Sequence, residues 1–231
     1  MHQRRESRPI AILGAGGYAR EVLWLIRECN AQTGTGFHPS AFIDDVTPEL
    51  QGISVCGLPV RGWEWFERMN QERRSGEQFA TICGVGSPRA KIAFVKKASK
   101  YDVEFISFIH PTVRLAREYV HIGKGCSITA GCIITTQVKI GDHVSLNLAT
   151  TVGHDSSIGD YSNLAPGTHV SGNVQIGIGV DIGTGATIIP GVRIGNNSII
   201  GAQACVVSEV QDHVTAVGVP ARAIKGLDPT G

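Results

Sequence analysis

The apolar residues between positions 122 and 206 recur with a period of six. Every sixth position there is Ile, Leu or Val, in the order Ile122, Ile128, Ile134, Ile140, Leu146, Val152, Ile158, Leu164, Val170, Ile176, Ile182, Ile188, Ile194, Ile200 and Val206. A small or β-branched residue lies two positions before most of them. A period of six fits neither the 3.6 of a helix nor a plain alternating strand. It predicts short strands that each end in a corner and wind as a prism, with both kinds of side chain pointing to the axis.

Such hexapeptide repeats are typical of a parallel β-helix. With three hexapeptides in each coil, this stretch predicts about five coils. Glycine often follows the aliphatic residue, at positions 123, 141, 153, 159, 177, 183, 195 and 201, where it is expected to relax the corner. A β-sandwich with chance alternation would not place its turns at one fixed spacing. After Val206 the period fails, and segment 214–222 is expected to leave or cap the coil.

The first hundred residues follow a different pattern. The apolar run 9–13 stops at Gly14, and Val22, Leu23 and Ile26 then recur at helical spacing. Strand, glycine-rich turn and helix form the layout of a nucleotide-binding βα unit. Two further strands and two further helices are expected, at 40–45, 79–83, 63–69 and 88–98. The chain is therefore predicted to hold a Rossmann-like α/β domain over residues 1–108, with three or four parallel strands, and a β-helix domain over residues 109–231.

Candidate substrate contacts of the first domain lie where its strands end. The turn Gly14-Ala15-Gly16-Gly17 departs from a full GxGxxG because position 19 is Ala, which close helix–strand packing tolerates. Backbone N–H groups at such a helix start attract phosphate. Asp44 and Asp45 end the next strand, where such folds hold a ribose or base. The alternative for this pair is a solvated turn that one of them caps. Gly84 opens a second glycine turn.

Composition narrows the classes of function. The net charge of +1 gives no basic footprint for nucleic acid. No run of about 18 apolar residues is present, so no membrane span is expected. The polar first ten residues lack an apolar signal core, which indicates a cytoplasmic location. The six cysteines are scattered without CxxC or Cys/His ligand spacing, so no metal site is expected.

The GAGGYARE unit, the FIDD strand end, the hexapeptide coil and the closing VGVPAR segment together resemble one family over nearly the whole chain. This family is the left-handed β-helix acyltransferases with a sugar-nucleotide-binding N-terminal domain. It includes sialic-acid O-acetyltransferases and nucleotide-amino-sugar N-acetyltransferases. The resemblance implies a left-handed coil, although the usual crossover rule would predict a right-handed one. It also implies acetyl-CoA as co-substrate and a homotrimer with active sites at the subunit interfaces.

His154 is the candidate general base. An imidazole titrates near neutral pH, and the adjacent Asp155 would stabilise its charged form. Adjacent residues in a strand face opposite ways, so this pairing requires a bend at the corner or a second subunit. The alternative is an exposed loop histidine. In the related N-acetyltransferases the base lies in a motif N-x6-H-[DE], which Asn147, His154 and Asp155 match. The resemblance makes Asn147 a residue that holds the site or the substrate. His143 and His169 fall at solvent-facing positions and are expected to have no catalytic role.

By family position, acetyl-CoA is expected to lie along the outside of the coil. The residues that would line this groove are Asn163, Gly183, Thr184, Gly201 and Ala202. Asn163 occupies the position, nine residues after the base, where relatives can carry a second histidine. Its amide can donate a hydrogen bond to a thioester carbonyl but cannot shuttle a proton, which favours a one-base mechanism. The small residues would allow the pantetheine to approach the backbone.

The resemblance implies an acetyl-CoA-dependent N-acetyltransferase of bacterial surface-glycan biosynthesis, such as that of lipopolysaccharide. The amine of a nucleotide-linked 4-amino sugar would attack the thioester directly. The main alternative is O-acetylation of a sialic acid or another sugar hydroxyl. A scaffold with a dead site would have been favoured by replacement of His154 or Asp155, and both are present. A hexapeptide carbonic anhydrase would need several histidines converging on zinc.

Overall fold

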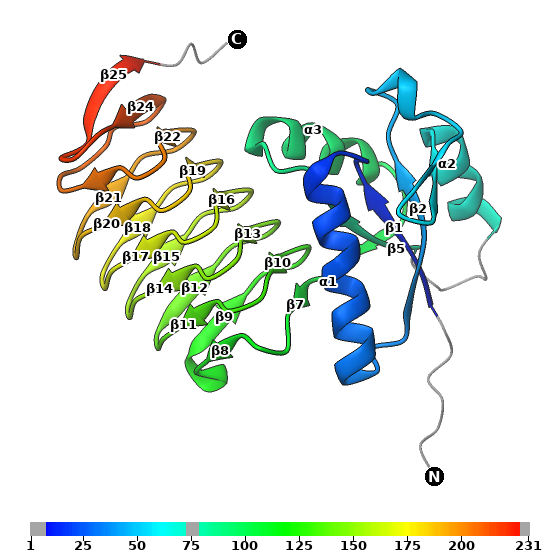
Figure 1. Ribbon diagram of the computed structural model, residues 1–231, viewed down its shortest axis with the longest axis horizontal. Coiled ribbons are helices and arrows are strands. Elements are labelled where there is room, and N and C mark those ends of the chain that lie inside the picture. Colours follow the sequence, from blue (N-terminus) through cyan, green and yellow to red (C-terminus); the bar gives the residue numbers. More distant parts are fainter. Residues whose placement is uncertain (1–7, 73–78, 227–231) are drawn as a thin grey trace.

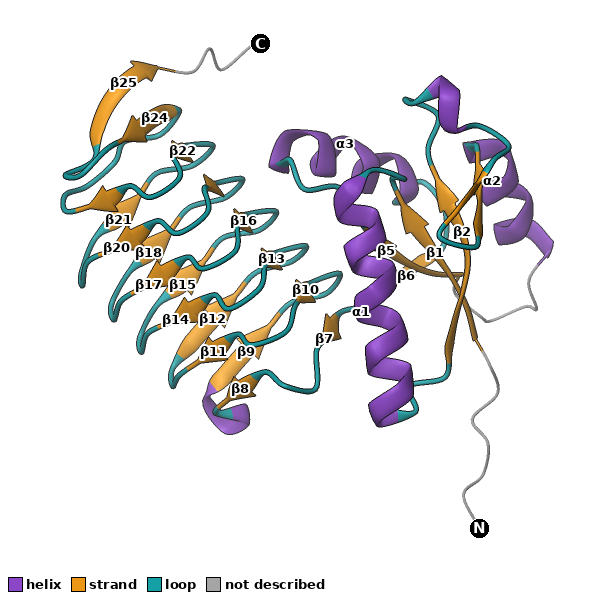
Figure 2. Ribbon diagram, in the orientation of Figure 1, coloured by secondary structure: helices purple, strands orange, loops and turns teal. Residues whose placement is uncertain are grey.

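The structure, a computed structural model, describes residues 8–72 and 79–226. An α/β unit is followed by a β-helix, and helices α1 (Gly17–Thr33) and α3 (Pro88–Ala98) lie beside the coil (Figure 1, Figure 2). The polar segment 1–7, on which the expected cytoplasmic location rests, is outside the described residues. The architecture changes between the strands β6 (Val103–Phe105) and β7 (Phe108–Ile109), and a domain boundary at residue 108 stays a proposal.

The α/β unit is built on one sheet with the strand order β3-β4-β2-β1-β5-β6. Its elements are β1 (Arg8–Leu13), α1 (Gly17–Thr33), β2 (Phe37–Ile43), a 3₁₀ turn (Pro48–Leu50), β3 (Ser54–Val55), β4 (Leu58–Arg61), α2 (Trp63–Glu72), β5 (Phe79–Cys83), α3 (Pro88–Ala98) and β6 (Val103–Phe105). The strands and helices expected from the sequence are confirmed. The sheet is larger than three or four strands, because β3 and β4 form a hairpin whose turn residues Cys56 and Gly57 have φ of 49° and 82°.

Both faces of this sheet are buried, which parallel sheets require. Ile10 and Ile12 of β1 pack toward α1, with Val22 and Ile26. The alternate residues of β1 belong to the cluster that holds Phe66 of α2 and residues of α3. The carboxyl ends of β1, β2 and β5 are therefore held rigidly between layers of helices, and the glycine turns begin there.

The β-helix is a left-handed prism, and each of its three faces is built from parallel strands. The first face, β7 (Phe108–Ile109), β10 (Ser127–Ile128), β13 (Ser145–Leu146), β16 (Asn163–Leu164), β19 (Asp181–Ile182) and β22 (Ile199–Ile200), continues into β24 (Val214–Val217) and β25 (Arg222–Gly226). The second face is β8 (Arg114–Leu115), β11 (Ile133–Ile134), β14 (Thr151–Val152), β17 (His169–Val170), β20 (Thr187–Ile188) and β23 (Cys205–Val206). The third face is β9 (Val120–Ile122), β12 (Val138–Ile140), β15 (Ser157–Ile158), β18 (Gln175–Ile176) and β21 (Arg193–Ile194).

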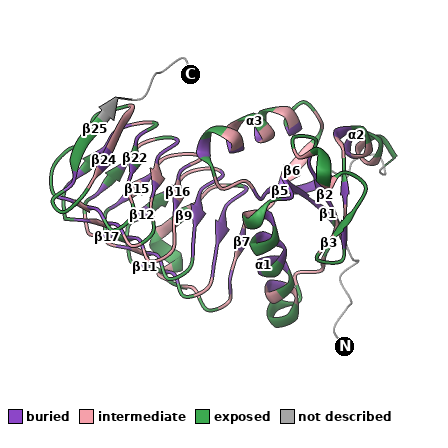
Figure 3. Cartoon of the chain, turned by 45° about the horizontal axis from the view of Figure 1, so that its top comes forward, coloured by how far each residue is buried: buried purple, intermediate pink, exposed green. Residues whose placement is uncertain are grey.

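We call the corner from the first to the second face the first edge, the next corner the second edge, and the corner back to the first face the third edge. The hexad aliphatics from Ile128 to Val206 are all buried, as predicted, and form one axial core (Figure 3). The expected closing segment also forms: β24 pairs with β22, and β25 folds back antiparallel on β24. The last coil is thus covered on its first face.

The glycines that follow the aliphatics have a different role from the one expected. Left-handed φ values occur two residues later, at corner positions such as His143 (57°), Asp155 (58°) and Asn173 (58°). A Cβ on Gly153 would lie 2.6 Å from the backbone nitrogen of Gly172 in the next coil. Glycine is required at position 153 because neighbouring coils approach closely there, and not because the chain turns left-handed at that residue.

The coil also begins one turn earlier than the hexads. Ile109 and Leu115 stack in register on Ile128 and Ile134 of the next coil. A 3₁₀ turn (Arg117–Tyr119) precedes β9 and adds one residue between Leu115 and Ile122. Counting back in sixes from Ile122 therefore misses this first coil.

Candidate active site

The two glycine turns lie side by side at the carboxyl edge of the α/β sheet. The Gly14 N–H donates to the Ile43 carbonyl at 2.7 Å, and the Gly84 N–H donates to the Leu13 carbonyl at 2.8 Å. The chain places β2 and β5 on opposite sides of β1, so this edge is a topological switch point, where open α/β sheets bind ligands. We call Gly14–Gly17, Asp44–Asp45 and Gly84 together the nucleotide-loop cluster.

The turn glycines are fixed by packing as well as by conformation. Gly14 has a φ of 89°, and a Cβ there would lie 2.8 Å from the Val85 side chain. A Cβ on Gly84 would lie 2.7 Å from the Cα of Ala19 in α1. Gly16 caps α1 without a side-chain hydrogen bond, so the first N–H groups of this helix are not used by a cap. They remain donors for an anion at the helix start.

The two carboxylates of the cluster have separate roles. Asp44 is buried and accepts backbone N–H groups from Ala15 at 3.0 Å, Val46 at 2.9 Å and Thr47 at 3.1 Å. It holds the first glycine turn and its own turn in place, so the capping alternative describes Asp44 well. Asp45 is exposed and pairs with Lys97 at 2.9 Å. Of the two carboxylates, only Asp45 is exposed to solvent.

His154 and Asp155 form a pair on the second edge. The imidazole Nδ1 lies 2.8 Å from Asp155 Oδ2. Asp155 has a φ of 58°, and this left-handed corner turns its side chain toward its neighbour. The bend that the sequence required is therefore present within one chain. When Nδ1 carries the hydrogen and donates a hydrogen bond to the carboxylate, Nε2 keeps its lone pair. This tautomer of the imidazole is the one that a general base needs.

Gly172, one coil above, makes room for this imidazole. A Cβ on Gly172 would lie 2.6 Å from both Cε1 and Nε2 of His154. The His154 and Asp155 side chains are 58% and 52% exposed, so solvent weakens the electrostatic interaction within this pair. A cofactor or a second subunit that covers the pair would strengthen it, because removing water lowers the local dielectric constant.

Asn147 lies on the first edge, one prism face away from His154 along the chain. Its Oδ1 accepts the Leu148 N–H at 2.7 Å, and its Nδ2 lies 3.4 Å from Glu21 Oε2 of α1. The structure therefore does not bring Asn147 and His154 to the same edge of one coil. Asn147 instead links the coil to the first helix after the glycine turn.

The residues expected to hold acetyl-CoA follow the first face and first edge. Asn163 is on β16 and donates from Nδ2 to Asp181 Oδ1 at 2.8 Å. Gly183, Thr184, Gly201 and Ala202 follow β19 and β22 at the first edge. A Cβ on Gly183 would lie 2.5 Å from the Ala202 backbone nitrogen, so these coils are tightly stacked there. One chain thus offers the candidate groove at its first edge and the candidate base at its second.

Two side chains near the α/β unit were not identified from the sequence as buried. His143 is 2% exposed, so the expectation of a solvent-facing position is wrong. The reason is that the α/β unit covers this part of the third edge, where Phe105 contacts the ring. Lys91, in the first turns of α3, is 1% exposed and hydrogen-bonds to the coil. Only the docking of the two parts buries them, so no local pattern marks either residue. His169 is exposed, as predicted.

The two cysteines at inward positions of the coil, Cys126 and Cys132, are buried. Burial raises the pKa of Cys126 and of Cys132 to about 11, which keeps both as thiols. In residues 8–72 and 79–226, no group of three His, Cys, Asp or Glu side chains is arranged to hold a metal ion. No helix within these ranges is both long and apolar enough to cross a membrane.

Comparison with known proteins identifies the family of this chain. Residues 9–98 match the family described as PglD N-terminal domain. A perosamine N-acetyltransferase from Caulobacter crescentus, solved with CoA and GDP-perosamine, shares 30% identity with a TM-score of 0.83. The match covers 94% of this chain and 97% of that one. The chain belongs to the hexapeptide-repeat sugar acetyltransferases. A search of curated proteins finds no match.

Two further members of this family align over the same share of the chain. The acetyltransferase domain of PglB from Neisseria gonorrhoeae is 30% identical, with a TM-score of 0.81, and is covered completely. WeeI from Acinetobacter baumannii is 29% identical, with a TM-score of 0.81, and is also covered completely. The family resemblance and the left-handed β-helix predicted from the sequence are confirmed, and the protein is an acetyltransferase.

Proposed function

We propose that this acetyltransferase moves the acetyl group of acetyl-CoA to the amine of a nucleotide-linked amino sugar. The observation that carries the proposal is the presence, in one chain, of the nucleotide-loop cluster and the His154–Asp155 pair. The relatives support both co-substrates: the Caulobacter enzyme is solved with CoA and GDP-perosamine, and the PglB domain with acetyl-CoA. The proposal includes a cytoplasmic location and a role in building bacterial surface glycans.

His154 acts as the general base in this proposal. Nε2 takes a proton from the sugar amine as the amine attacks the thioester carbon, and the Asp155 carboxylate stabilises the resulting imidazolium. The tetrahedral intermediate collapses to the amide and expels CoA sulfur, and the His154 imidazolium returns its proton to that sulfur, so CoA leaves as its thiol and the base is restored. In this proposal, backbone N–H groups of the coil and the Asn163 amide stabilise the oxyanion. Two of the solved perosamine N-acetyltransferases carry a replaced histidine, as Asn in one and Ala in the other.

A homotrimer completes the site in this proposal, because the base and the candidate groove lie on different edges of one coil. A second copy that places its first edge against the second edge of the first would bring them together. Exposed apolar side chains support an interface around the second face: Leu148, Ile133, Ile189 and Val207 are 36–42% exposed. Sedimentation equilibrium should give three times the chain mass, and a catalytically active monomer would contradict this assembly.

The substrate class is tested by release of CoA thiol from acetyl-CoA in the presence of UDP-, GDP- and dTDP-linked amino sugars. We expect turnover with at least one of them and none with the same sugar nucleotides that carry hydroxyl in place of amine. Treatment of the product with hydroxylamine separates the two acceptors, since it cleaves an acetyl ester and leaves an amide intact. A hydroxylamine-labile product would favour the alternative, O-acetylation of a sugar hydroxyl.

A further inference from the structure

Lys91 is a buried cation that crosses from the α/β unit to the β-helix. Its Nζ donates to Ser145 Oγ at 2.8 Å and to the His143 carbonyl at 3.1 Å, with the Tyr161 carbonyl at 3.5 Å. All three acceptors are neutral and belong to the coil. Asp181 on β19 is the carboxylate that acts on this ammonium from a longer distance.

Tyr18 reaches the same place from the other helix. Its hydroxyl lies 2.7 Å from Ser127 Oγ, and Ser127 Oγ lies 3.2 Å from Ser145 Oγ. Both serines are 1% exposed and occupy neighbouring strands, β10 and β13, of the first face. Tyr18 of α1 and Lys91 of α3 therefore hydrogen-bond to one pair of neighbouring buried serines.

Each of these helices begins at a turn of the nucleotide-loop cluster. Tyr18 directly follows Gly17, the last residue of the first turn. The Lys91 N–H donates to the Ser87 carbonyl at 2.8 Å, closing the helical turn that follows Gly84. A shift of either glycine turn relative to the coil would therefore break a buried hydrogen bond.

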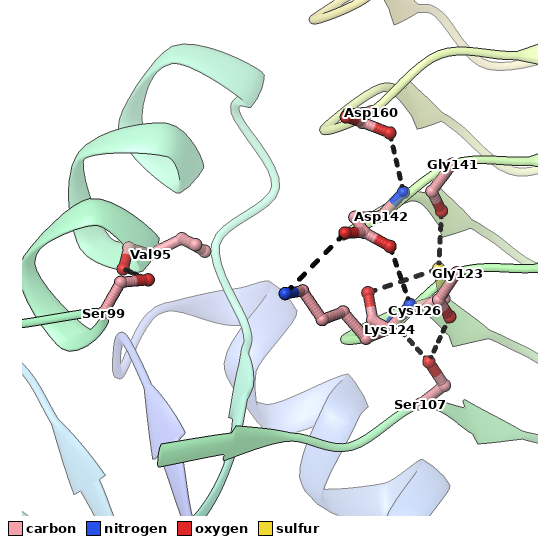
Figure 4. Close-up of polar contacts among 9 residues, drawn as sticks. All are labelled: Val95, Ser99, Ser107, Gly123, Lys124, Cys126, Gly141, Asp142 and Asp160. Carbon is pink, nitrogen blue, oxygen red and sulfur yellow. Dashed lines mark hydrogen bonds and ion pairs between the residues drawn. The ribbon is translucent and has the colours of Figure 1, made fainter. Parts of the chain in front are cut away.

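The linker between the two parts is fastened separately. Ser107 Oγ donates to the Gly123 carbonyl at 2.7 Å and accepts the Cys126 N–H at 3.0 Å (Figure 4). Beyond it, the Asp142 and Asp160 carboxylates accept N–H groups of the coil below them at the third edge (Figure 4). The linker thus holds the α/β unit to the first coil, while Lys91 reaches the next coils and resists rotation about that linker.

We propose that Lys91 is a positioning residue that, together with Tyr18, fixes the nucleotide-loop cluster relative to the coil, so that a bound sugar amine is held at attacking distance from the acetyl group. This role rests on the proposed function. Reaction rates depend steeply on such alignment, because a well-held pair of reactants avoids the entropy cost of a chance encounter.

Stability alone does not account for a lysine at this position. Burial lowers the pKa of Lys91 to about 8, so the protein holds the ammonium at neutral pH against a desolvation penalty. An apolar side chain of similar length is often as stable as a buried charge, or more so. What an apolar side chain cannot supply is a set of directional donors that define one orientation of α3 on the coil.

The test compares Lys91→Met with Lys96→Met, a matched change on the exposed side of the same helix. Isothermal titration gives the Kd of UDP, GDP or dTDP and the Kd of acetyl-CoA, and thiol release gives kcat with the accepted amino sugar nucleotide. We expect Lys91→Met to lower kcat by roughly tenfold or more while both Kd values change by less than about twofold. Lys96→Met should match wild type in all three quantities.

Unchanged kcat in Lys91→Met, or a loss of kcat that only follows weaker binding of either ligand, would overturn the positioning role. Tyr18→Phe deletes one hydroxyl and tests the same positioning role if Lys91→Met does not fold. This variant should also lower kcat while both Kd values stay unchanged. Wild-type turnover is measured first. Its absence with every amino sugar nucleotide would overturn the proposed function and this role together, whereas normal wild-type turnover isolates the role of Lys91.

Discussion

At the scale of single residues, His143 shows how docking changes a surface position. Its ring stacks on Tyr161 with the planes 9° apart and meets the Phe105 ring edge-on at a centroid distance of 4.6 Å. Burial lowers the pKa of His143 to about 4, with Asp142 acting in the opposite direction and Lys91 adding to the lowering. The imidazole is therefore neutral in the folded protein throughout the neutral range.

This lowered pKa predicts an acid-sensitive fold. Between pH 6.5 and 4 the unfolded chain binds a proton at His143 and the folded chain does not, so stability is lost as the pH falls. A change in pKa from 6.5 to about 4 corresponds to about 3 kcal/mol at full extent. His143→Asn keeps a residue that tolerates the left-handed corner and removes the titration.

Urea unfolding at pH 7 and pH 4.5 measures this effect. The free energy of unfolding of His143→Asn should fall less between the two pH values than that of wild type, by about 2 kcal/mol. Equal losses in the two proteins would show that His143 does not set the acid sensitivity.

At the scale of elements, the corners of the coil use glycine in two different ways, shown by Gly172 at the second edge and Gly159 at the third edge. A Cβ on Gly172 meets the His154 imidazole, which can rotate away. A Cβ on Gly159, at the third edge, would lie 2.5 Å from the backbone of Gly177, which cannot move without its coil. The first glycine therefore protects a side-chain position, and the second protects the stacking of coils.

Substitution of each glycine by alanine should separate activity from stability. Gly172→Ala should lower kcat by displacing the imidazole, with a stability loss below about 1 kcal/mol. Gly159→Ala should cost about 1–3 kcal/mol in the free energy of unfolding, because the backbone must shift. Thermal unfolding and thiol release on both variants test the contrast. Wild-type kcat in Gly172→Ala would mean that catalysis does not need the imidazole where the structure places it.

At the scale of the whole molecule, the repeated hexads made the coil predictable from the sequence. The packing of the α/β unit on the coil could not be predicted in this way. The hexads predicted the coil and its core because each repeat reports the same inward position many times. The α/β elements followed from apolar runs and glycine turns. The hairpin at Cys56–Gly57 was not predicted because it rests on a short turn. The hexads did not mark the first coil because a single extra residue breaks their register, although the β-helix domain predicted over residues 109–231 includes it.

The candidate site divides in the same way. His154 and Asp155 are neighbours in sequence, so their pairing needed only one left-handed corner, and the motif pointed to it. The contact by which Asp44 holds Ala15 of the first glycine turn, and the hydrogen bond that Lys91 makes to Ser145, join residues 29 or more positions apart. Contacts of that range leave no periodic trace in one sequence.

The proposed reaction depends on His154 as the base that takes a proton from the sugar amine as the amine attacks the acetyl thioester. Its most direct test is thiol release from acetyl-CoA by wild type and His154→Ala with the accepted amino sugar nucleotide, with acetyl-CoA binding measured on the same samples. We predict that His154→Ala loses turnover by about 10²- to 10⁴-fold and binds acetyl-CoA with nearly unchanged Kd. Near-normal turnover by His154→Ala would contradict the account.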